Sequence, residues 1–400
     1  MRPGRAFPPT LWLLATAHFL VDLYAATINP LWPDLQRGLR LGDGAIQWAF
    51  LSWSLASSVS QLFFGYWGDR ARGRWLLWLG PGAGVVALSS VGWATSFPAL
   101  CVLLLVAGLG IAAFHPEAAA MAGASAPGRR SQAMSVFAVG GYLGQAIGPI
   151  YSGVITTHSH IRTLAWGMTW GLVALALLAW ALRRRAGDFG AVPVTAPVSL
   201  TELLRGRGVA TGLVLAIGVL RILPSLGVPL ALAYLLKGRG ASNETVGMLQ
   251  AIFLGGVGAG SLGCALFVRP ALERRVLWTL PLLVTPLLLA MPALPSGVLV
   301  LVVGVAGVLL GMTLPILVSY GQRLLPEGQR VASSITMGVT WGLGGAIVAA
   351  TMAGCNHAQR PDLAFWVFAA GALLSGVLCA WLPEPESLAR VRAAAEEVLV

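Results

Sequence analysis

Charged residues are scarce in this sequence. Only 10% of its 400 residues are Asp, Glu, Lys or Arg, and 57% are hydrophobic, whereas an average soluble domain has about 25% charged residues. This composition rules out a disordered chain and argues strongly against a soluble multi-domain enzyme. Because one membrane-spanning helix needs roughly 20 apolar residues, the chain has room for about twelve spans and for no sizeable domain outside the membrane. We therefore predict a polytopic helical membrane protein.

Lysine and cysteine are scarce as well. Lys237 is the sole lysine, and the arginines occur in short groups between apolar runs. This distribution is typical of the loops of a membrane protein and not of a nucleic-acid-binding face, so we expect no nucleic-acid partner. The cysteines show no C-x-x-C spacing and lie in or beside apolar runs, which predicts small buried hydrophobes rather than a metal site or a disulfide framework. They are Cys101, Cys264, Cys355 and Cys379.

Twelve apolar runs are long enough to be membrane spans. The first carries Asp22 and has no small-residue cleavage site, so we interpret it as a retained helix rather than a signal peptide. The predicted spans are 10–31, 44–66, 75–93, 97–122, 131–155, 162–182, 208–236, 244–267, 276–292, 296–319, 331–354 and 363–383.

The positive charges favour one orientation in the membrane. With a cytoplasmic N-terminus, 19 Arg or Lys residues lie in cytoplasmic segments and 6 on the opposite side, while Arg221 lies inside a span. We therefore expect both termini in the cytoplasm. The polar stretch between spans six and seven reads as a linker. It divides the chain into a six-helix bundle at 1–183, a cytoplasmic linker at 184–207, a second six-helix bundle at 208–383 and a cytoplasmic tail at 384–400.

The two halves are weakly similar to each other. A shift of 199 residues superimposes Pro30–Leu31 on Pro229–Leu230, and the same shift brings Asp22 onto Arg221. Two six-helix halves in the same orientation form a parallel repeat, an arrangement found in transporters whose binding site lies at the midplane between the halves.

Several motifs then resemble one family, the major facilitator superfamily. Residues 65–74 (GYWGDRARGR) are similar to its loop between spans two and three, although Arg72 and Gly73 stand in swapped order. Residues 144–153 resemble the span-five signature of its antiporters, with Ser152 in place of the usual glycine. The segments 18–22 (HFLVD), 114–117 (FHPE) and 139–144 (VGGYLG) are similar to its fosmidomycin-resistance efflux subgroup. The resemblance implies an all-α, twelve-helix transporter that works by alternating access.

Ionisable residues inside spans mark the candidate site, because a charge at the bilayer centre costs roughly 2.5–3.5 kcal/mol. His18 and Asp22 lie four residues apart and therefore on one helix face. We interpret Asp22 as the main proton-coupling residue, with His18 as its relay, and Glu117 as a second proton site. The alternatives are a structural hydrogen-bonded pair for His18 and Asp22, and loop ion pairs with Arg129 or Arg130 for Glu117.

His115 precedes Pro116, which should free the carbonyl of Ala112 in the preceding turn. Either His115 or a water could then bond to that carbonyl. The other predicted role of His115 is substrate binding. Arg221 cannot release its proton, so it needs an anionic partner, either Asp22, Glu117 or an anionic solute. Gln145 and Trp341 complete the predicted substrate-binding set, although packing is the favoured role for Trp341.

Two sets of residues are predicted to act in gating. Asp69, Arg70 and Arg74 would form a charge latch, and the alternative is plain positive-inside charge. Gly144, Gly148 and Pro149 form a small-residue seam in span five, where helices approach closely.

The sequence thus predicts a proton-coupled antiporter that exports a small anionic or amphiphilic solute, such as a drug, from the cytoplasmic membrane of a bacterium. Its predicted partners are the solute, protons and membrane lipid, and we expect a monomer. We predict no enzyme activity, no cofactor other than the proton gradient and no metal, because no histidine or carboxylate set is clustered along the chain. The alternatives are a proton symporter or facilitator that imports a metabolite, an integral membrane enzyme acting on lipid, and a sensor without flux.

Overall fold

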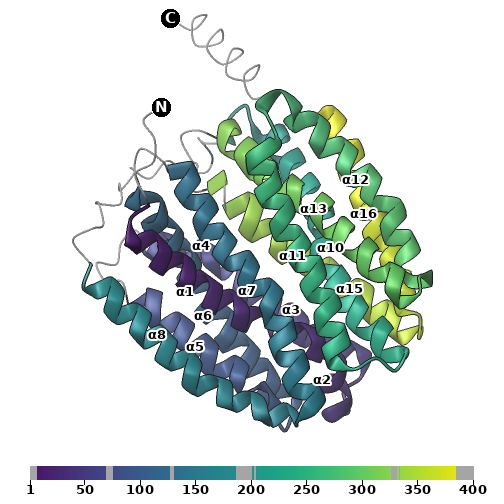
Figure 1. Cartoon of the computed structure of the whole chain (residues 1–400). Helices are drawn as coiled ribbons and strands as arrows, with labels where there is room; N and C mark the ends of the chain where they lie inside the picture. Colours follow the sequence, from purple (N-terminus) through teal and green to yellow (C-terminus); the bar gives the residue numbers. More distant parts are fainter. Residues whose placement is uncertain are drawn as a thin grey trace, which may run out of the picture.

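The computed structural model describes residues 7–68, 75–126, 130–185, 201, 204–325, 331–332 and 334–383, and these residues are almost entirely helical. The helices form two bundles that lie side by side (Figure 1). One bundle contains the N-terminal half of the chain, drawn in purple and blue, and the other contains the C-terminal half, in green and yellow. The predicted tail at 384–400 and most of the predicted linker lie outside the described residues, so the boundaries of the linker and the tail remain a prediction.

The N-terminal bundle contains eight α-helical segments. They are α1 (Pro9–Ala26), α2 (Trp32–Gly38), α3 (Asp43–Ser58), α4 (Ser60–Gly68), α5 (Leu76–Ser89), α6 (Phe97–Ser125), α7 (Arg130–His158) and α8 (Gly167–Arg183). The short turn η1 (Asn29–Leu31) joins α1 to α2.

The C-terminal bundle follows the same plan with longer helices. Its helices are α10 (Gly208–Gly238), α11 (Asn243–Phe267), α12 (Glu273–Ala290), α13 (Ser296–Leu324), α15 (Thr340–His357) and α16 (Ala364–Leu378), and the π-helical segment η9 (Ser334–Val339) precedes α15.

Ten helices of the described chain are long and apolar enough to cross a membrane. The second predicted span corresponds to α3 and α4, which are divided at Val59, and the third to α5; residues 69–74 between them lie outside the described chain, so the count of twelve spans stays a prediction. At the junction of α3 and α4, the Gln61 amide donates to the Ser57 carbonyl at 2.8 Å. At the end of the 14-residue helix α5, the Ser90 hydroxyl donates to the Val86 carbonyl at 2.8 Å.

The exterior of the bundles is apolar, unlike that of a soluble protein, and a few charged residues are buried in the hydrophobic interior. Large apolar side chains such as Leu79, Leu177, Leu301 and Trp366 are more than half exposed on the outside. Conversely, Asp22 and Arg221 are 4% and 2% exposed. An apolar exterior around buried charges suits contact with lipid, where backbone groups must be satisfied within helices.

The two halves meet along two helix pairs. Between α7 and α11, Gly247 packs against the Pro149 carbonyl, and a Cβ at Gly258 would lie 2.8 Å from the Tyr142 side chain. Between α3 and α15, Gly345 packs against the Ser54 hydroxyl. These close approaches need glycine, so both seams are tight contacts between the halves.

Candidate functional site

Asp22 lies at the centre of a buried polar cluster in the N-terminal half. Its Oδ2 atom is 3.4 Å from Nε2 of His18, one turn earlier on α1, and its Oδ1 atom is 3.2 Å from Nε2 of His115 on α6. The Gln145 amide on α7 donates to Oδ2 at 2.8 Å. We call these four residues the Asp22 cluster. Three helices thus converge on a single carboxylate.

Backbone carbonyls fix the orientation of both histidine rings. Nδ1 of His18 is 2.8 Å from the Phe137 carbonyl, and Nδ1 of His115 is 2.9 Å from the Ile111 carbonyl. A carbonyl oxygen accepts and cannot donate, so each Nδ1 carries a hydrogen. A neutral ring would then present the bare lone pair of Nε2 to the Asp22 carboxylate, which repels it. The two short contacts therefore require a proton or another cation between Nε2 and the carboxylate.

Helix α7 closes the back of the cluster. A Cβ at Gly141 would lie 2.5 Å from Nε2 of His18 and 2.9 Å from Oδ2 of Asp22, so only glycine fits there. The sequence analysis did not single out this residue as a site residue. Its place in a Gly-Gly pair four residues before Gln145 is the signal that could have found it.

Arg221 lies on α10 in the other half and is 2% exposed. Its Nη1 donates to the Thr313 hydroxyl at 3.2 Å, whereas Nε and Nη2 have no hydrogen-bond partner within the described part of the chain. No carboxylate among those residues lies within 4.0 Å of the guanidinium, so neither Asp22 nor Glu117 is the ion-pair partner weighed from the sequence. A buried cation with free donors is a site for an anion.

Tyr142 lies on α7, one residue after Gly141, and its side chain packs against Gly258 on α11 of the other half. Sequence reasoning missed it, because a tyrosine in an apolar run gives no distinguishing pattern. Its position links the Asp22 cluster to the packing between the two halves.

Comparison with known proteins shows the family. The model of the Major Facilitator Superfamily matches residues 14–349. The chain belongs to the major facilitator superfamily. It is 28% identical over 389 residues to the fosmidomycin resistance protein of Escherichia coli, which spans 94% of this chain and 92% of that protein. It is also 24% identical over 354 residues to YfnC of Bacillus subtilis, an uncharacterized transporter of this superfamily, covering 86% and 85% of the two chains.

Solved structures of other transporters share the fold. A nucleoside transporter, NupG, superimposes with a TM-score of 0.72 at 12% identity, covering 93% of this chain and 99% of its own. A D-xylose–proton symporter superimposes with a TM-score of 0.67 at 14% identity, covering 94% and 98%. This member of the superfamily is therefore a multi-pass membrane transporter.

Two other predicted site residues, Trp341 and Glu117, lie outside the Asp22 cluster. Trp341 lies on α15, and its indole Nε1 is buried without a partner in the described chain. Because its neighbour Thr340 packs against Gly218 on α10, Trp341 lies near the level of Arg221. Glu117 is partly buried on α6 and makes none of the contacts to Asp22.

Three further expectations meet different outcomes in the transporter. The ring of His115 bonds to the Ile111 carbonyl, not to Ala112 as its place beside Pro116 suggested, because Nδ1 reaches the carbonyl four residues back. Gly144 and Gly148 pack against the carbonyls of Phe19 and Leu23 on α1, inside one half. Pro149, the third residue of the predicted span-five seam, contacts Gly247 of the other half through its carbonyl. The predicted latch of Asp69, Arg70 and Arg74 lies outside the described residues and stays a prediction.

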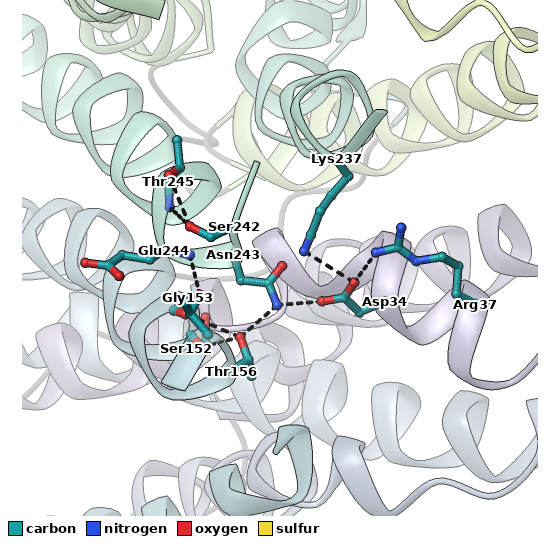
Figure 2. Close-up of polar contacts among 11 residues, drawn as sticks. Asp34, Arg37, Ser152, Gly153, Thr156, Lys237, Ser242, Asn243, Glu244 and Thr245 are labelled. Atoms are coloured by element: carbon teal, nitrogen blue, oxygen red, sulfur yellow. Dashed lines mark hydrogen bonds and ion pairs between the residues drawn. The ribbon is translucent and has the colours of Figure 1, made fainter. Parts of the chain in front are cut away.

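A polar network that the sequence did not reveal joins the two halves of the transporter at one end (Figure 2). Asp34 on α2 accepts from Asn243 Nδ2 at 2.5 Å and lies 3.5 Å from Lys237 Nζ, while Arg37 bonds it from the same helix. Asn243 also donates to the Thr156 hydroxyl at 2.9 Å. Lys237 and Asn243 belong to α10 and α11, so these bonds hold the C-terminal half against α2 and α7. We call these five residues the Asp34 network.

Proposed function

We propose that this transporter is a proton-coupled antiporter that exports a small anionic or amphiphilic solute. In this proposal it works as a monomer in the cytoplasmic membrane of a bacterium, with twelve spans and both termini in the cytoplasm. Alternating access would occur by rocking of the two halves about the α7–α11 and α3–α15 seams.

The observation that carries the proposal is the contact of one buried carboxylate with two oriented histidines. Asp22 and His18 are nearly inaccessible, whereas the His115 side chain is 22% exposed. Because both Nδ1 atoms are committed to backbone carbonyls, protons can occupy only the Nε2–carboxylate contacts. Loss of a proton would leave a lone pair facing an anion and would push His115 away from Asp22. The protonation state of the cluster is thereby coupled to the packing of α1 against α6.

Arg221 supports an anionic solute. Its two free N–H donors and the free indole N–H of Trp341 face no partner within the described chain, and leaving buried donors unpaired costs about 1–3 kcal/mol each. A carboxylate, phosphate or phosphonate would satisfy the guanidinium with two parallel bonds. Helix α7, which carries Gln145 and packs Tyr142 against Gly258 of the other half, offers a path by which solute and proton would influence each other's binding.

The direction of transport is supported by the relative from Escherichia coli, whose name describes resistance to a drug and suggests efflux. The competing function is import by a symporter. The nucleoside and xylose transporters share only the fold, so they favour neither direction.

Inverted membrane vesicles test the proposal. Respiration acidifies their lumen, a pH-sensitive dye reports it, and phosphonates, organic anions and lipophilic cations are then added in turn. An antiporter releases luminal protons when its solute is added, whereas a symporter does not. We expect release with an anion, and its loss in Asp22→Asn and in Arg221→Ala. Asp362→Asn, at a partly exposed carboxylate that pairs with Arg360 away from the Asp22 cluster, is the matched control and should behave like the parent.

Two results would contradict the proposal. Full proton exchange in Asp22→Asn would remove the Asp22 cluster from the coupling mechanism. No response to any solute, with the protein folded and inserted, would favour import or a carrier without proton coupling. Solute counterflow in liposomes would then distinguish a carrier from a sensor without flux.

A further inference from the structure

The Asp22 cluster contains the ligand set of a metal site. One ring nitrogen of His18, one ring nitrogen of His115 and a carboxylate oxygen of Asp22 all lie within 4.8 Å of one another. The sequence predicted no metal, because no histidine or carboxylate set is clustered along the chain. Asp22 and His115 lie 93 residues apart in sequence, and the packing of α1 against α6 brings them together.

The spacing of these atoms suits a small divalent ion. Zinc bonds to histidine nitrogen and carboxylate oxygen are about 2.0–2.2 Å long, so neighbouring ligands in a tetrahedral site lie roughly 3.3–3.5 Å apart. His18 Nε2 lies 3.4 Å from Oδ2 and His115 Nε2 lies 3.2 Å from Oδ1, and the three ligand atoms lie within 4.8 Å of one another, so a small shift of the partly exposed His115 ring would bring the set to this spacing. Two imidazoles and one carboxylate favour Zn²⁺, Co²⁺ or Ni²⁺ over Mg²⁺ or Ca²⁺, which prefer oxygen.

The second independent feature is the set of hydrogen bonds behind the ligands. Metal-binding histidines usually donate their other ring N–H to a backbone carbonyl or a carboxylate, which fixes the tautomer that presents the lone pair to the ion. Both histidines do this, to Phe137 and Ile111, at 2.8 Å and 2.9 Å. The ring of His18 is held further by stacking on Phe137, with centroids 4.1 Å apart. The carboxylate in turn accepts from Gln145.

We propose that the transporter binds one divalent transition-metal ion, of the Zn²⁺ class, at His18, Asp22 and His115. The ion occupies the gap between the Nε2 atoms and the carboxylate, which otherwise requires protons. Three protein ligands leave a fourth position open for water, as in sites that exchange their ligands. The partly exposed His115 side chain gives the ion its entry. Because all three ligands belong to the N-terminal half, binding does not require a particular arrangement of the two halves.

Cobalt titration of the purified full-length protein tests this proposal. The protein carries a tag without histidine and is washed with a chelator, and Co²⁺ is followed by its visible absorption bands. We expect one Co²⁺ per chain, displaced by Zn²⁺. Affinity should fall at least tenfold in His18→Gln and in His115→Gln. His158→Gln is the control, because His158 faces Glu244 at an exposed position far along α7 and should leave binding unchanged.

A conservative variant keeps the test decisive if a glutamine variant does not fold. His115→Cys supplies a thiolate ligand, so we expect it to retain Co²⁺ and to add a sulfur-to-cobalt charge-transfer band. The proposal is overturned if the folded parent binds no Co²⁺, if binding survives in both glutamine variants, or if the cysteine variant binds without the new band. Metal binding is measured here without transport. A parent that binds Co²⁺ but exchanges no protons would therefore refute the proposed function alone.

Discussion

Removing the Asn243 side chain should loosen the end of the transporter where the Asp34 network joins the two halves. Asn243 is 5% exposed and bonds to two groups of the other half, the Asp34 carboxylate and the Thr156 hydroxyl. Asn243→Ala removes both bonds without adding bulk. It leaves the 3.5 Å contact of Lys237 with Asp34 as the remaining side-chain link of this network between the halves.

The expected size of the effect follows from the bonds. A hydrogen bond to a charged group contributes about 1.5–3 kcal/mol and a neutral one about 0.5–1.5 kcal/mol. The Oδ1 atom of Asn243 is buried and has no partner in the described chain, so its removal returns roughly 1 kcal/mol or more. The net loss is about 2 kcal/mol for the closed arrangement of this end. Because each 1.4 kcal/mol changes an equilibrium constant tenfold, the closed-to-open ratio should fall about 30-fold.

Distances between spin labels measure this ratio. Gly42 and Gly238 lie at this end in different halves, and a Cβ at either position meets nothing within 4 Å, so cysteines introduced there carry the labels. In a background without native cysteines, we expect Asn243→Ala to shift the distance distribution towards a longer component. Ser242→Ala is the control, since its hydroxyl caps α11 and makes no bond to the other half. Identical distributions for Asn243→Ala and the parent would refute the reasoning.

Three substitutions probe the rest of the site. Gly141→Ala should abolish proton exchange in vesicles, because its methyl group displaces the Asp22 cluster at a cost of about 1–3 kcal/mol. Gly263→Ala is the control and should leave exchange unchanged, because a Cβ there meets nothing within 4 Å. Normal exchange in Gly141→Ala would contradict the packing argument. Gly345→Val should slow solute flux at least tenfold, because its side chain would push α3 away from α15. Gly354→Val, on the same helix but with nothing within 4 Å, should leave the flux unchanged. Equal fluxes in the two variants would show that this seam does not limit transport. Arg221→Lys keeps the charge but loses the planar fork, so the KM for an anionic solute should rise about tenfold with less change in kcat; an unchanged KM would remove the guanidinium from the binding site.

The membrane architecture could be predicted from the sequence because it depends on local composition. Ten of the twelve predicted spans correspond to long apolar helices. The second and third predicted spans correspond to the shorter helices α3, α4 and α5, and residues 69–74 between them lie outside the described chain, so the count of twelve stays a prediction. The family motifs were informative because each is a short contiguous segment.

The site was only partly predictable. His18 and Asp22 were paired correctly because four residues on one helix fix their relative position. His115 and Gln145 were chosen as polar residues within spans, but their contact with Asp22 depends on the packing of α6 and α7. Arg221 was predicted to need an anion, and helix packing leaves it without a carboxylate partner within the described chain.

The sequence by itself determined that this chain crosses the membrane many times and belongs to a transporter family. It also determined that few charges are buried, because the burial of each charge must be compensated wherever it occurs. Only the tertiary structure decided which groups meet. It gathered two histidines and a carboxylate from α1 and α6 around ligand-sized gaps, and it placed Gly141 against His18 and Asp22 and Tyr142 against Gly258 of the other half. It also joined Asp34 to Lys237 across the halves. These contacts arise from the packing of helices far apart in sequence, and no local pattern encodes the register in which two helices pack.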